Sequence, residues 1–207
     1  LKYFSGLAAE KLWKDKLYSV ARIDFSEIKN VAGLADFERQ LDEVLENAFQ
    51  PLGFHRSHAS SMSLVKQLSA WMRTLPVNSM VLLIDEYDSP QAACLEDKRL
   101  FNAIRMRLAA FYAVIKSNDA CLRFVFITGI AKFNQTGIFS ELNDFTDISL
   151  NPAFGTLLGY SEAEIEHCFS GYLDRAARVL GLSREAVLGR LRESYDGYCF
   201  DEKASTH

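Results

Sequence analysis

Apolar and polar residues follow two different periods along the first part of the chain. Residues 19–25 (SVARIDF) alternate loosely and are rich in strand-forming residues, so they predict a β-strand followed by a turn. Over residues 34–48 apolar side chains recur every three or four positions with acidic residues between them, which predicts a helix that stops near Pro51. The same period over residues 64–75 predicts a second helix that ends before Pro76.

The helical period disappears at residue 80, where an unbroken apolar run begins. Residues 80–84 (MVLLI) are typical of a strand that is buried on both faces of a parallel sheet. A long helix is predicted over residues 98–116, and residues 122–127 (LRFVFI) predict another buried strand. Strand, helix and strand at this spacing form a crossover unit, so we expect an α/β fold with a parallel sheet and helices on its faces.

Only helical patterns follow residue 152. Ser161 and Glu164 have the spacing of a capping box, which predicts the start of one helix that continues to about residue 179 and ends at Gly181. Ser183 is placed to cap a last helix. We therefore expect a core over residues 1–152 and a small, helical, lid-like subdomain over residues 153–207.

The composition narrows the class of protein. The chain has 207 residues, of which 49% are hydrophobic and 24% charged, as in ordinary globular proteins. Its formal net charge is −4 and its basic residues are scattered, so charge supports neither nucleic-acid nor membrane binding. No apolar run is long enough to span a bilayer, and we expect a cytoplasmic protein. The four cysteines form no Cys-x-x-Cys pair, which argues against a zinc site or a disulfide framework.

Polar residues follow two of the predicted strands at the point where each strand ends. Asp85 and Glu86 come directly after the apolar run 80–84, and Thr128 follows residues 122–127. The carboxyl ends of strands in an open α/β sheet form the ligand crevice, so these side chains are candidates for a site. The alternatives are that the acids only end a strand in solvent, and that Thr128 bonds a backbone group.

Three strings of the sequence resemble known proteins, and they occur in the order LLIDEYDSP, FVFITGIAKFNQTGIFSELNDFTDISLNPAFGTLLGYSEAEI and YDGYCF. Together they resemble a bacterial AAA-ATPase-like family. In family members the AAA-ATPase-like domain often precedes a PD-(D/E)XK nuclease-like domain. Family members share an acidic Asp-Glu-Tyr-Asp, matched here from Asp85 to Asp88, and Thr-Gly-x-x-Lys-Phe, matched from Thr128 through Lys132. The resemblance spans nearly the whole chain and implies a P-loop NTPase fold that uses ATP and Mg²⁺.

The resemblance also implies a role for each matched residue. Asp85 would hold the Mg²⁺ shell, through water, and Glu86 would polarise the attacking water. Thr128 would act as the sensor of the γ-phosphate, and Asp88 and Lys132 would contribute to nucleotide binding. For Lys132 an ordinary solvated loop lysine is the alternative.

The sequence departs from the family pattern in two places. None of its eleven glycines is followed by Lys-Ser or Lys-Thr, so the phosphate-binding loop (Walker A) has no match. We expect that the first strand and this loop are missing and that the chain alone is inactive. Cys199 stands where the family usually has an arginine.

Other functions remain as alternatives. A non-enzymatic binding or signalling scaffold that retains the AAA fold would carry the same acids. A nuclease is disfavoured, because Glu27-Ile28-Lys29 matches its Glu-x-Lys pattern without an upstream acid in a supporting strand. His55 and His58 have no third metal ligand nearby. As partners we expect nucleotide, further copies of the chain, since AAA relatives commonly form rings, and a fused or associated nuclease-like domain.

Overall fold

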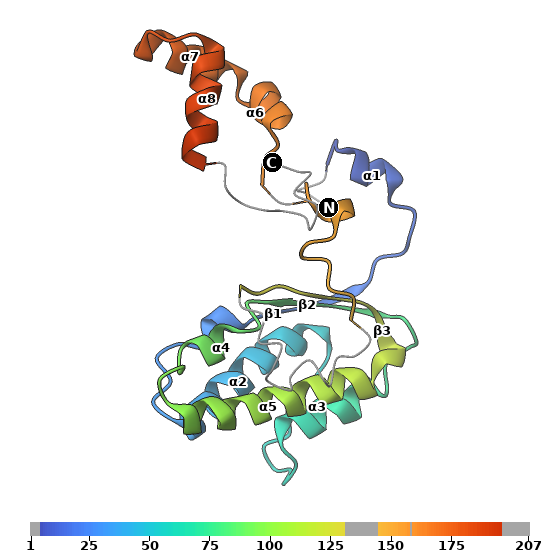
Figure 1. Cartoon of the computed structure of the whole chain (residues 1–207). Helices are drawn as coiled ribbons and strands as arrows, with labels where there is room; N and C mark the ends of the chain where they lie inside the picture. Colours follow the sequence, from blue (N-terminus) through green and yellow to red (C-terminus); the bar gives the residue numbers. More distant parts are fainter. Residues whose placement is uncertain (1–4, 131–144, 158, 196–207) are drawn as a thin grey trace. The chain divides into compact units, whose positions relative to one another are not determined.

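The computed structural model describes residues 5–130, 145–157 and 159–195. The chain divides into two compact units, Leu1–Asn143 and Asp144–His207, which are described separately (Figure 1). No helix among the described residues has both the length and the apolar character needed to cross a membrane.

The first unit is built on a three-stranded parallel sheet. Its strands are β1 (Ser19–Asp24), β2 (Met80–Asp85) and β3 (Leu122–Ile127), in the order β1-β2-β3. The register pairs Asp24 with Asp85 and Ile84 with Ile127. All three strands therefore point their carboxyl ends to the same edge, and the predicted α/β fold with a parallel sheet is confirmed.

Helices connect these strands, as the crossover pattern predicted. The first crossover contains α2 (Leu34–Phe49) and α3 (Leu64–Met72), and the second contains the short α4 (Ser89–Ala92) and α5 (Lys98–Ser117). Short 3-10 turns, η2 (Phe25–Glu27), η3 (Gln50–Leu52) and η4 (Asp119–Cys121), lie at the ends of these elements. A further short helix, α1 (Ala8–Leu12), precedes β1.

The core of the first unit lies between the sheet and its crossover helices. Figure 1 shows α2, α3 and α5 on one side of the sheet. The apolar stripe of each helix is buried there, since residues three and four apart share a helix face. The buried side chains come from alternate positions of the strands and from these helices, among them Ala21, Ile23, Leu82, Ile84, Leu41, Leu45, Leu68, Leu108 and Phe111.

The opposite face of the sheet differs from the prediction. Val81 and Leu83 of β2 are only partly buried, and the side chain of Phe124 in β3 is 53% exposed. The apolar runs predicted strands buried on both faces, and this was wrong for the described residues. The physical reason is that α2, α3 and α5 all pack on one face, so the alternate strand positions on the other face keep contact with water.

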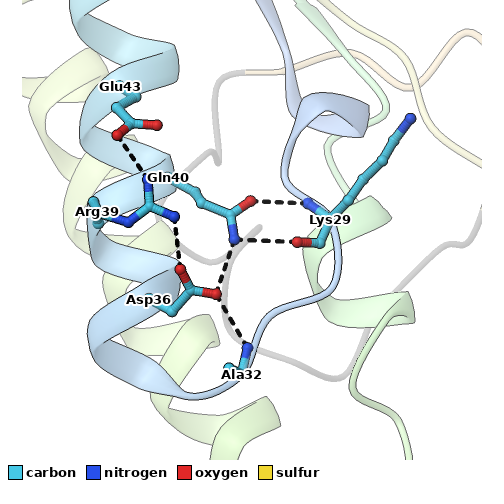
Figure 2. Close-up of polar contacts among 6 residues, drawn as sticks. All are labelled: Lys29, Ala32, Asp36, Arg39, Gln40 and Glu43. Atoms are coloured by element: carbon cyan, nitrogen blue, oxygen red, sulfur yellow. Dashed lines mark hydrogen bonds and ion pairs between the residues drawn. The ribbon is translucent and has the colours of Figure 1, made fainter.

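The loop after β1 is fastened to α2 by side-chain hydrogen bonds (Figure 2). The Gln40 side chain accepts from the Lys29 N–H at 3.0 Å and donates to the Lys29 carbonyl at 3.1 Å. Asp36 accepts from the Ala32 N–H at 3.1 Å and from the Gln40 amide at 3.0 Å. Hydrogen bonds from Arg39, and then from Ala32, lower the pKa of Asp36. These contacts fix the chain where it leaves the carboxyl end of β1.

The second unit is helical in its described part. It contains a 3-10 turn, η6 (Pro152–Phe154), and the helices α6 (Glu162–Cys168), α7 (Ser170–Leu180) and α8 (Arg184–Tyr195). The capping box of Ser161 and Glu164 is confirmed, and so are Gly181 in the left-handed conformation (φ 65°) at the end of α7 and the Ser183 hydroxyl at the start of α8.

One helix boundary in this unit was not predicted. The single helix expected from Ser161 to Gly181 is divided at Phe169, whose backbone (φ −111°, ψ 17°) leaves the helical region. Ser170 and Gly171 follow directly, and both have weaker helix propensity than alanine, glycine by about 1 kcal/mol. The Phe169 ring packs edge-on against the Tyr160 ring, with 5.4 Å between the ring centroids.

Candidate active site

Three polar residues form one row across the carboxyl edge of the sheet. Asp24 and Asp85 are the last residues of β1 and β2 and lie opposite each other. Thr128 follows the last residue of β3, whose partner is Ile84. The alignment arises because three parallel strands end in register, so residues far apart in the sequence share one edge.

Asp85 and Thr128 are joined directly. The Thr128 hydroxyl donates a hydrogen bond to Oδ1 of Asp85. The Thr128 N–H donates to the Ile84 carbonyl at 2.9 Å, and its carbonyl accepts from the Tyr87 N–H at 3.0 Å. The polar ends of β2 and β3 are therefore fixed to each other by both backbone and side chain, and the Asp85 side chain remains 46% exposed.

Glu86 occupies an unusual backbone conformation at this edge. Its φ of 49° lies in the left-handed region, which costs roughly 1–2 kcal/mol for a residue with a side chain. The flanking hydrogen bonds maintain the conformation, since the Ser89 N–H donates to the Glu86 carbonyl at 2.9 Å and the Tyr87 N–H is held by Thr128. The side chain of Glu86 is exposed and lies next to Asp85 in the chain.

Asp88 is buried beneath this edge, unlike the other acids. Its side chain is 4% exposed, and its two oxygens accept from the Ile130 N–H at 3.3 and 3.2 Å. A β-carbon on Gly129 would lie 2.4 Å from the Tyr87 ring and 2.5 Å from Asp88, so this close packing requires glycine. Burial, and then the charges of Tyr87 and Asp88, raise the pKa of the neighbouring Tyr112. Asp88 thus joins the loops after β2 and β3, and its role in nucleotide binding stays a prediction.

Two residues of this edge were missed in the sequence. Oδ1 of Asp24 accepts from the Ser26 N–H at 3.0 Å and from the Ser26 hydroxyl at 2.6 Å. Nη2 of Arg22 lies 3.8 Å from Oδ2 of Asp24 and 3.6 Å from Oδ2 of Asp85. The signal for Asp24 was present, because SVARID ends in an aspartate as VLLID does. Lys132 and Cys199 lie outside the described residues.

The oxygen donors of the edge fit a water-mediated magnesium site. Mg²⁺ is usually held by one or two carboxylates, by water and by substrate phosphates, and does not require an all-protein cage. Asp85 offers a half-exposed carboxylate for such a shell. Among the residues that the structure describes, no group of three or more His, Cys, Asp or Glu side chains could hold a metal ion alone. The donor set therefore suits a hydrated ion that is shared with a substrate.

Comparison with known proteins shows the family to which the chain belongs. The profile of the AAA-ATPase-like family, described as predicted AAA-ATPase, matches residues 1–139. The chain belongs to this family. It is also 30% identical over 196 residues to a protein of Azotobacter chroococcum mcd 1 described as an uncharacterized protein in the vnfD 5′ region. That match covers 94% of this chain and 36% of the relative, so the chain spans about a third of the relative's length. No solved structure matches it.

Proposed function

We propose that this chain carries the water-activating and sensor residues of a module that binds and hydrolyses ATP. The observation that carries the proposal is the hydrogen bond from Thr128 to Asp85 at the carboxyl edge of a parallel sheet, with Glu86 next in the chain. Membership of a family described as predicted AAA-ATPase supports it. The carboxyl edge is also where ligands bind in open α/β sheets.

Each residue has a distinct role in the proposed reaction. Asp85 would hold the metal shell, and Thr128, the proposed sensor of the γ-phosphate, orients this carboxylate by donating its hydroxyl hydrogen to Oδ1. Glu86 accepts the proton of the water that attacks the γ-phosphate, a role that suits an exposed carboxylate beside the metal ligand. Mg²⁺, when bound, neutralises negative charge on the phosphate oxygens. Asp88 and Lys132 stay predicted nucleotide contacts.

Substitutions at the acidic pair test this assignment. The test uses a form of the protein that carries a Gly-Lys-Ser or Gly-Lys-Thr loop in addition to these residues. Glu86→Gln should retain nucleotide binding and lower turnover by roughly 10²–10⁴, the usual contribution of a general base. Asp85→Asn should weaken the magnesium-dependent part of binding, because the amide carries no charge. Calorimetry and phosphate-release assays measure the two effects.

A matched control separates these roles from a general loss of charge. Glu43→Gln removes a carboxylate from α2, where Glu43 pairs with Arg39, and should leave turnover unchanged. Unchanged turnover in Glu86→Gln would remove this residue from catalysis. Failure of every form to bind Mg-ATP would instead favour the non-enzymatic scaffold. A cytoplasmic location, assembly with further copies and a nuclease-like partner domain stay predictions.

A further inference from the structure

Arg22 brings a positive charge to the acidic edge of the sheet. It precedes Asp24 by two positions on β1, so both side chains stand on the same face. In the register, Arg22 lies opposite Leu83, and Asp24 lies opposite Asp85. The Arg22 side chain reaches along the strand until Nη2 is 3.6 Å from Oδ2 of Asp85 and 3.8 Å from Oδ2 of Asp24.

The two oxygens of Asp85 therefore have different partners. Oδ1 accepts from the neutral hydroxyl of Thr128, and Oδ2 faces the guanidinium of Arg22. A cation that binds Asp85 through Oδ2 therefore meets the oxygen that already faces the charge of Arg22. The Arg22–Asp85 ion pair can open, because the Arg22 side chain is 68% exposed. The distance of 3.6 Å between Nη2 and Oδ2 also exceeds the roughly 2.7–2.9 Å of a close charge-assisted hydrogen bond.

Asp24 provides Arg22 with a second partner. Its Oδ1 is occupied by Ser26, so Oδ2 is the oxygen left facing the guanidinium. Arg22 can thus release Asp85 and remain at the edge beside Asp24. Because Asp24 is held by Ser26 and stays beside Arg22, the ion pair between Arg22 and Asp85 is the one that can open.

We propose that Arg22 is a positioning residue that holds the Asp85 carboxylate while the metal is absent and releases it to a divalent cation. This inference rests on the proposed function, in which Asp85 holds the metal shell. Arg22 competes with the metal for Asp85 and keeps this carboxylate neutralised between binding events. Removal of Arg22 should therefore strengthen metal binding at Asp85.

The test uses the metal alone and the 207-residue chain, without nucleotide. Mn²⁺ replaces Mg²⁺ because it prefers the same oxygen ligands and broadens the signals of nearby nuclei. It is titrated into the isotope-labelled chain while the amide signals of Asp85, Thr128 and Ile130 are followed by NMR. Arg22→Gln should bind Mn²⁺ at this edge roughly two- to five-fold more tightly than the unsubstituted chain, the range expected for loss of an exposed ion pair.

Three further variants complete the experiment. Arg22→Lys keeps the charge and should restore most of the original affinity. Arg123→Gln removes another strand arginine, which pairs with Asp15, and should have no effect. In an Asp85→Asn background, Arg22→Gln should no longer change Mn²⁺ binding, because the two residues would then be uncoupled.

The failures of the two proposals can be distinguished. If Asp85→Asn weakens local Mn²⁺ binding but Arg22→Gln leaves it unchanged or weaker, the role of Arg22 is overturned and that of Asp85 stands. If Asp85→Asn has no effect on Mn²⁺ binding, the role of Arg22 as a competitor of the metal is overturned, and the role of Asp85 in a metal site shared with nucleotide is decided separately by the Mg-ATP measurement on Asp85→Asn. If the role of Arg22 were only structural, Arg22→Gln would not raise the affinity of the edge for Mn²⁺.

Discussion

At the scale of single residues, Gln91 is the least satisfied polar side chain near the site. It lies in α4, three positions after Asp88, and is 0% exposed. Within the described part of the chain, neither its amide oxygen nor its amide nitrogen has a hydrogen-bond partner. A buried polar group without a partner costs about 1–3 kcal/mol. Gln91→Met keeps the shape of the side chain and should raise the free energy of unfolding of the first unit by about that amount, measured by urea denaturation.

Gln67 is the matched control for this substitution. Its side chain accepts from the Ser57 N–H at 2.8 Å and donates to the carbonyls of Ser57 at 3.2 Å and Met62 at 2.9 Å. Gln67→Met removes these bonds and should lower the free energy of unfolding. A loss of stability in Gln91→Met would contradict the prediction and show that the Gln91 amide is paired in solution.

The site residues differ in how far sequence could predict them. The positions of Asp85 and Thr128 could be predicted, because each residue directly follows an apolar run and the ends of parallel strands lie at one edge of the sheet. The contact between Arg22 and Asp85 was not, because it depends on the register between β1 and β2 and on one rotamer of a long side chain. The burial of Asp88 was hidden for a similar reason, since it depends on the close approach of Gly129.

At the scale of elements, periodicity predicted the positions of helices and strands better than it predicted which faces of the strands are covered by other elements. The strand β2 and the helix α5 begin at the predicted residues, because each pattern is unbroken and its ends carry turn residues or a cap. The exposure of Phe124 on β3 could not be predicted, because an apolar run has the same appearance whether one face or two faces are covered. The break at Phe169 also went unseen, since the apolar spacing continues across it.

The start of α6 gives a test of a local signal. The Ser161 hydroxyl accepts from the Glu164 N–H at 3.3 Å, and Glu164 accepts from the Ser161 N–H at 2.8 Å. Ser161→Ala should destabilise this helix by about 1 kcal/mol, the usual effect of losing an N-cap. Amide hydrogen exchange in α6 measures it, because the two units need not unfold together. Ser161→Thr keeps the cap and is the control. Equal exchange in the alanine and threonine variants would contradict the prediction.

This cap should also depend on pH. Hydrogen bonds from the backbone and then the side chain of Ser161 lower the pKa of Glu164. The contribution of Glu164 to helix stability is therefore fully present above the pKa of this carboxyl in the unfolded chain, about 4.3. It is lost as the pH falls through the lower pKa of Glu164 in the folded chain. The difference between Ser161→Ala and Ser161→Thr should shrink in the same acidic range.

At the scale of the whole molecule, the charges at the carboxyl edge decide what the chain can hold by itself. Asp24, Asp85 and Glu86 place three carboxylates there, and Arg22 is already shared between two of them. A triphosphate in this type of fold is held mainly by the backbone N–H groups, the lysine and the hydroxyl of a Gly-Lys-Ser/Thr loop. No glycine of the 207 residues begins such a sequence. The edge thus carries the acids proposed to act on a metal and a water, and these 207 residues contain no Gly-Lys-Ser/Thr loop to hold the phosphates.

The 207-residue chain alone should therefore neither bind Mg-ATP tightly nor hydrolyse it measurably. We expect a dissociation constant above about 1 mM, which corresponds to a binding free energy weaker than about 4 kcal/mol. Calorimetry with Mg-ATP and a phosphate-release assay on the same sample measure both quantities, and Mg²⁺ without nucleotide provides the baseline. Raising the salt concentration should not bring the dissociation constant into the micromolar range, because screening weakens the repulsion by the acids but supplies no phosphate ligands. Micromolar binding by this chain would contradict the prediction and show that groups other than a Gly-Lys-Ser/Thr loop hold the phosphates.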